Sequence, residues 1–154
     1  MLAYSKEFSD SLTEIQSTED ETINCIRASS SLQKPTFVAI KLSGLSRSDE
    51  LHELEREIHN LVLSSSSHNS THIYSKAQQI LTRYPVLLER LRRIASVARK
   101  FDVQLILDAE IRYQDDVDAG PNSAILCSVL NGGGHGNLWN THQMYCPRLL
   151  FSYS

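Results

Sequence analysis

Two charged residues, Lys41 and Asp108, each stand at the end of a short apolar stretch, which begins at Phe37 in one case and Val103 in the other. An ammonium and a carboxylate about 4 Å apart attract each other by roughly 4 kcal/mol at an intermediate dielectric. Leaving either charge unpaired in a buried site costs a comparable amount. Lys41 and Asp108 are therefore candidate site residues, either as an ion pair or as a pair that holds a charged ligand.

The stretches that carry these residues have the composition of β-strands. Residues 37–42 form an apolar strand with Lys41 near its carboxyl end, and residues 103–108 form a branched apolar run typical of a strand buried on both faces of a parallel sheet. Alternation places Lys41 and Asp108 on one face, which we assign to a barrel interior. Ligands of parallel α/β folds bind at the carboxyl ends of the strands, where both residues would lie. A helix N-cap is the alternative interpretation of Asp108.

The connection between the two strands is predicted to be helical, which makes the unit a βαβ crossover. One helix starts at Ser48 and places its apolar residues on one face, and the serine-rich residues 64–70 end it as a flexible loop or an insertion. A second helix spans 84–100, because Tyr84-Pro85 is a start signal and a clean apolar stripe follows. We interpret its basic residues as a solvated face.

Further elements are predicted on either side of this crossover. An acidic patch favours a helix over 19–28, residues 124–130 fit one or two helical turns, and residues 137–145 fit a third strand. The glycine-rich residues 131–136 match neither phosphate-binding motif and indicate a plain connector. The pattern predicts an α/β fold with about three parallel strands and flanking helices.

The composition narrows the functional class. The chain has 154 residues, a net charge of −3 and ordinary apolar content, which is typical of one globular domain and argues against a nucleic-acid partner. No apolar run is long enough to cross a bilayer. Cys25, Cys127 and Cys146 are odd in number and widely spaced, so neither a disulfide framework nor a metal site is predicted.

Three segments match, in order, the motifs of one enzyme family. Residues 37–42 (F-V-A-I-K-L) are similar to F-[AV]-A-[IV]-K-[LV]-T, and residues 105–113, which contain L-I-L-D-A-E and Tyr113, are similar to L-[ML]-[VI]-D-A-E-x-x-Y. Residues 140–143 (N-T-H-Q) are similar to N-T-Y-Q, and helix 84–100 resembles the basic, leucine-rich helix that precedes the D-A-E strand. The chain thus resembles the flavin-dependent proline dehydrogenases of animal mitochondria.

This resemblance implies a distorted (β/α)₈ barrel that holds FAD noncovalently over the carboxyl ends of its strands. It implies oxidation of L-proline to pyrroline-5-carboxylate by hydride transfer to the flavin, which then reduces a membrane quinone. A mitochondrial location and an association with the inner membrane follow from it, although residues 1–20 do not look like a transit peptide. Lys41 resembles the lysine near the substrate carboxylate, Asp108 the active-site aspartate, Ala109 its neighbour at the substrate pocket, and Gln143 the glutamine that hydrogen-bonds the flavin ring system.

The chain also departs from the family pattern. His142 stands where the family has tyrosine, and residues 115–117 (D-D-V) replace a phenylalanine-glutamine-proline type of continuation. The later strands, the flavin-holding glycine and histidine segments and the C-terminal arginine pair have no counterpart, and a closed barrel takes about 250 residues. We therefore expect a truncated form, with an N-terminal helical segment (1–35), a partial barrel domain (36–145), an atypical tail (146–154) and one uncovered sheet face.

Two other functions remain open at this point. The chain could be a non-catalytic relic or interaction fragment of the same family. Independently of the resemblance, a lysine at a strand end of a (β/α) rim can form a Schiff base with a carbonyl substrate, which would give Lys41 a covalent role.

Overall fold

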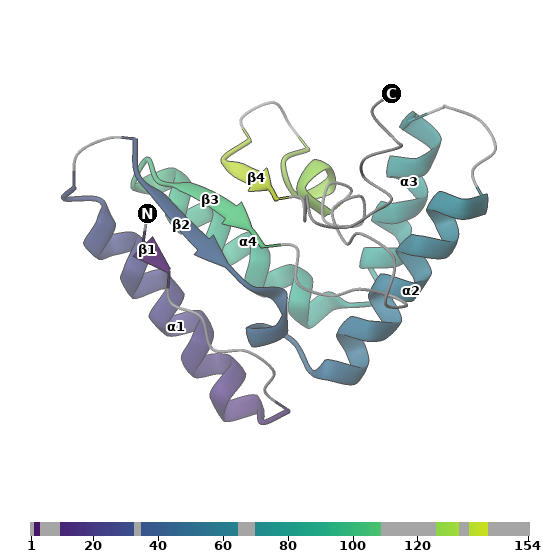
Figure 1. Ribbon diagram of the computed structural model, residues 1–154, viewed down its shortest axis with the longest axis horizontal. Coiled ribbons are helices and arrows are strands. Elements are labelled where there is room, and N and C mark those ends of the chain that lie inside the picture. The colour runs from purple at the N-terminus through teal and green to yellow at the C-terminus, as the bar shows by residue number, and fades with distance from the viewer. Residues whose placement is uncertain are drawn as a thin grey trace.

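The computed structural model describes residues 2–3, 10–32, 35–64, 70–108, 126–132 and 136–141, which form an α/β fold (Figure 1). Four parallel strands lie in the order β1-β2-β3-β4 and span Leu2–Ala3, Phe37–Ile40, Gln104–Leu107 and Leu138–Asn140. The helices are α1 (Leu12–Ser29), the 3-10 helix η1 (Leu42–Gly44), α2 (Ser48–Ser64), α3 (Ser70–Leu81) and α4 (Pro85–Lys100). None of the described helices is both long and apolar enough to traverse a membrane.

The strands are found where the sequence predicted them, but they are shorter. β2 ends at Ile40 because the chain curls into η1, and β3 ends at Leu107. The third predicted strand is present as β4, although residues 142–145 of its expected span lie outside the described residues, as does the predicted tail 146–154. The prediction missed the short strand β1, which pairs with β2. An α/β fold with a parallel sheet is therefore confirmed.

The described helices cover only one face of this sheet. Val38, Ile40, Leu105 and Leu107 point to the covered face and are at most 2% exposed. Phe37, Ala39, Gln104 and Ile106 alternate with them on the opposite face and are half-buried. The prediction that residues 103–108 are buried on both faces is therefore wrong. Helix α1 contacts β2, α4 contacts β3, and the two helices contact each other, so both lie on the same side of the sheet.

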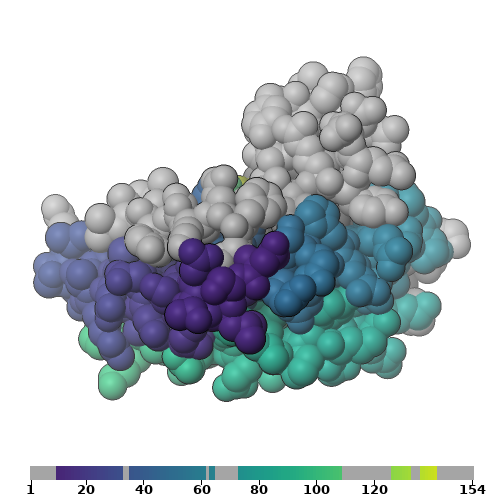
Figure 2. Space-filling model, turned by 90° about the horizontal axis from the view of Figure 1, so that it is seen from below, coloured from purple at the N-terminus to yellow at the C-terminus, as the bar shows by residue number. Residues whose placement is uncertain are grey.

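Helices α1 and α4 pack through a buried ion cluster as well as apolar contacts. Figure 2 shows the purple surface of α1 adjoining the teal surface of α4. The Glu19 side chain of α1 is 2% exposed and lies 2.9 Å from Arg93 Nε and 3.4 Å from Arg90 Nε. Gln16 Nε2 donates a hydrogen bond of 3.2 Å to the same carboxylate. The interpretation of the basic residues of α4 as a solvated face was wrong for Arg90, whose side chain is only 13% exposed.

The helical content exceeds the prediction in two places. α1 begins seven residues before the expected start at Glu19, at Leu12. The connection from β2 to β3 contains three α-helices, not two, because α3 follows the serine-rich residues. The apolar spacing of α3 was present in the sequence: Ala77 and Leu81 are buried, and Ile73 and Ile80 pack against the core. Residues 65–69, part of the predicted loop, lie outside the described residues.

A Schellman motif ends α4 and directs the chain into β3. The Asp102 N–H donates to the Arg99 carbonyl at 3.2 Å, and the Val103 N–H donates to the Ala98 carbonyl at 2.9 Å. Asp102 takes the left-handed conformation at φ 53°, which aspartate tolerates better than most residues. The fully buried Val103 then anchors the start of the strand that carries Asp108.

The turn before β4 buries a cysteine. Residues 126–130 are helical, in agreement with the turns predicted over 124–130, and Cys127 is 5% exposed. Burial raises the pKa of its thiol to about 12.

This burial predicts slow alkylation of Cys127 in the folded protein. Because the thiolate is the reactive form, iodoacetamide at about pH 8.5 should modify Cys127 much more slowly than in denaturant, where the thiol titrates near its ordinary pKa of about 8.5. Peptide mass spectrometry of each cysteine measures the rates, and the partly exposed Cys25 is the internal control. Equal rates at Cys127 with and without denaturant would contradict its burial.

Candidate functional site

The carboxyl ends of β2 and β3 bring Lys41 and Asp108 together. Ile40 pairs with Leu107 in register, and the Asp108 N–H donates to the Ile40 carbonyl at 3.0 Å, so the two residues that follow are neighbours. Lys41 Nζ lies 3.9 Å from Asp108 Oδ2. The sequence-based prediction of this pair at one rim of the sheet is therefore matched by the geometry.

The end of β4 adds a third side chain to this rim. The Thr141 hydroxyl lies 3.2 Å from the Leu107 carbonyl oxygen and 3.4 Å from Asp108 Oδ1, and it can donate its proton to either acceptor. Thr141 therefore orients the carboxylate from the side opposite Lys41's strand. We had not predicted it as a site residue, although it lies in the N-T-H-Q segment that carries the family resemblance.

The ion pair is partly exposed to solvent. The side chains of Lys41 and Asp108 are 21% and 43% exposed. At this exposure water screens the attraction further, so the ion pair contributes far less to folding than the roughly 4 kcal/mol expected at an intermediate dielectric, and closer to the 1 kcal/mol or less that is typical at surfaces. The contact between the two charges therefore adds little to the stability of the fold.

The sheet face below the rim is apolar and partly open. Ala39 and Ile106 are paired across β2 and β3, and Ile106 is paired with Trp139 of β4, so these side chains share the face of Lys41 and Asp108. Trp139 is 56% exposed, and its Nε1 donates to Gln104 Oε1 at 2.9 Å, which holds the indole against the sheet. A half-open apolar strip therefore leads up to a charged rim.

Two predicted site residues cannot be placed beside this pair. Ala109, the expected substrate-pocket neighbour, and Gln143, the expected flavin contact, lie outside the described residues. The alternative of a helix N-cap at Asp108 concerns the same undescribed stretch, residues 109–125.

No protein-family model matches the chain. A search of curated proteins likewise finds no match.

Proposed function

We propose that the chain is a flavin-dependent proline dehydrogenase, and that Lys41 and Asp108 form part of its L-proline site. The observation that carries the proposal is the 3.9 Å approach of Lys41 Nζ and Asp108 Oδ2 at a partly exposed strand rim, within the two segments that resemble the family. The proposal includes FAD as hydride acceptor, a quinone as electron acceptor, and a mitochondrial location with association to the inner membrane.

The strand order supports a (β/α) barrel segment. The described strands are all parallel and follow one another in sequence order, with no reversal of direction across the sheet. A doubly wound sheet has a switch point where the order reverses, whereas a barrel adds its strands in sequence and keeps the helices outside. Helices α1 and α4 both lie on the covered face, as the barrel arrangement requires.

The charges at the rim suit the two ends of a zwitterionic amino acid. The Lys41 ammonium would bind the carboxylate of proline, and the Asp108 carboxylate would accept a hydrogen bond from its amine, with Thr141 fixing the orientation of Asp108. Charge-assisted contacts of this kind are stronger than neutral ones and position the substrate. The residue pair thus supports recognition of an amino acid at this edge.

The apolar strip beside the pair suits a planar ring. Ala39 and Ile106 are half-buried, and Trp139 forms a wall at the side of β4. When bound, a flavin supplies a two-electron acceptor for the hydride of the substrate. Gln143 would hold the flavin by hydrogen bonding, as the family resemblance implies.

The test is FAD binding followed by proline-dependent reduction. FAD is titrated into the purified chain and followed by flavin fluorescence, and L-proline is then added without oxygen to look for bleaching of the flavin absorbance. Replacing Lys41 with alanine should weaken the response to proline by roughly 10- to 100-fold, since a hydrogen bond to a charged group contributes about 1.5–3 kcal/mol. Lys76→Ala removes an exposed lysine of α3 and is the matched control.

Other outcomes separate the alternatives. A folded chain that binds FAD but is not reduced by proline would indicate a non-catalytic member of the family. A chain that binds no FAD would refute unaided dehydrogenase activity. Trapping of a carbonyl compound on Lys41 by borohydride would instead support the Schiff-base function.

A further inference from the structure

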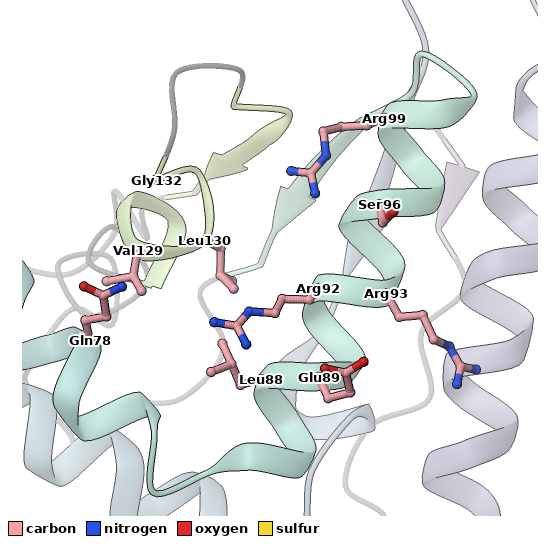
Figure 3. A pocket seen from close by; sticks show the side chains of 10 residues that line it. All are labelled: Gln78, Leu88, Glu89, Arg92, Arg93, Ser96, Arg99, Val129, Leu130 and Gly132. Carbon is pink, nitrogen blue, oxygen red and sulfur yellow. The ribbon is translucent and has the colours of Figure 1, made fainter.

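A polar cavity lies on the helical side of the molecule, away from the Lys41–Asp108 rim. It has a volume of about 600 Å³ and lies between α4, α3 and residues 129–132 (Figure 3). Arg99, at one end of the cavity, belongs to the last turn of α4 and so precedes β3, whereas Asp108 follows the opposite end of that strand. The cavity is therefore distinct from the proposed proline site.

Two arginines of α4 supply the charge of this cavity. Arg92 and Arg99 are seven residues apart, which places them on the same face of the helix, and Figure 3 shows both side chains extending from α4 on the side of residues 129–132. Arg93 points the other way, toward α1, and is paired with Glu19 and Asp20. Across the described residues neither Arg92 nor Arg99 forms an ion pair with a carboxylate.

The spacing of the two arginines favours an extended anion. At a rise of about 1.5 Å per residue, their Cα atoms are roughly 10 Å apart along the helix axis. Two guanidiniums rooted that far apart bracket an extended anion better than a single carboxylate or phosphate. The Ser96 hydroxyl, one turn after Arg92, lies between them along the helix and adds a hydrogen-bond donor. The planar guanidinium group of an arginine can donate two parallel hydrogen bonds to the oxygens of one phosphate.

The rest of the lining is suited to an organic group. Leu88, Val129 and Leu130 provide apolar surface, and Gln78 of α3 contributes an amide at the edge. The volume falls in the range of about 300–1,000 Å³ that is usual for small-molecule sites. Among the described residues that line the cavity, Glu89 is the one carboxylate, so the two arginines outweigh it there.

We propose that this cavity, the Arg92–Arg99 groove, binds a small organic diphosphate. The arginines hold the diphosphate, and the apolar lining with Gln78 holds the organic group. A nucleoside diphosphate has this combination of an extended anion and a flat, partly apolar body, and ADP is therefore the probe.

Isothermal titration of the full chain with ADP and with inorganic pyrophosphate tests the proposal. ADP should bind saturably and several-fold more tightly than pyrophosphate, and Arg92→Gln and Arg99→Gln should each weaken ADP binding by roughly tenfold or more, as loss of a charge-assisted contact predicts. Arg56→Gln removes an exposed arginine of α2 with the same change of charge and should leave the affinity unchanged. Lys41→Ala should also leave it unchanged, which separates this site from the proline site.

Three results would overturn the proposal. The first is that ADP shows no saturable binding. The second is that Arg56→Gln weakens ADP binding as much as Arg92→Gln and Arg99→Gln do. The third is that ADP and pyrophosphate bind with equal affinity. Circular dichroism of each variant establishes that the fold is retained, which is expected because Arg92 and Arg99 are exposed.

Discussion

Replacing Glu19 with glutamine is expected to lower the free energy of unfolding by about 1.5–3 kcal/mol, the usual contribution of a hydrogen bond to a charged group. The Glu19 carboxylate is 2% exposed and contacts both Arg90 and Arg93, and Arg90 is itself 13% exposed. Glutamine has nearly the same shape but no charge, so the loss measures electrostatics and not packing. Because small domains are stable by only about 5–15 kcal/mol, this is a large part of the total.

Urea unfolding followed by circular dichroism measures this effect. Glu21→Gln is the matched control, since Glu21 lies on the same helix with an exposed side chain and should change stability by no more than about 0.5 kcal/mol. A double-mutant cycle with Arg90→Met then isolates the coupling between the two helices. A loss at Glu19 no larger than at Glu21 would mean that the cluster does not hold α1 on α4.

Replacing Ile40 with alanine is the second large effect that the fold predicts. Ile40 is 2% exposed on the covered face of the sheet, and its truncation should cost about 2–5 kcal/mol because the surrounding core closes the cavity only in part. The physical basis is the packing of that face against the helices. Urea unfolding again gives the free energy.

Ile106→Ala is the control for this prediction, with the same change of side chain on the opposite face of the neighbouring strand. Ile106 is half-buried, so its truncation should cost less than that of Ile40 by about 1 kcal/mol or more. The difference between the two variants reports the one-sided burial of the sheet. Equal losses would mean that the second face is as well packed as the first.

The sequence alone was sufficient for the elements whose signals are local. The apolar stripe after Tyr84-Pro85 predicted α4, which spans Pro85–Lys100. The apolar runs predicted β2 and β3, the period-2 geometry of a strand placed Lys41 and Asp108 on one face, and the structure brings these two residues within 3.9 Å at the rim. These predictions agree with the structure because the periodicity of a helix, and the alternation of side chains between the two faces of a strand, depend only on consecutive residues.

Only the tertiary structure decided the features that depend on contacts between distant segments. Whether one or both faces of β3 are covered depends on which side α1 and α4 occupy, and the strand's own composition does not encode that side. The approach of Thr141 to Asp108 requires the pairing of β4 with β3, and the burial of Glu19 requires two arginines from another helix. A polar residue in an isolated helix is expected to face water, and only a partner brought in by packing makes its burial favourable.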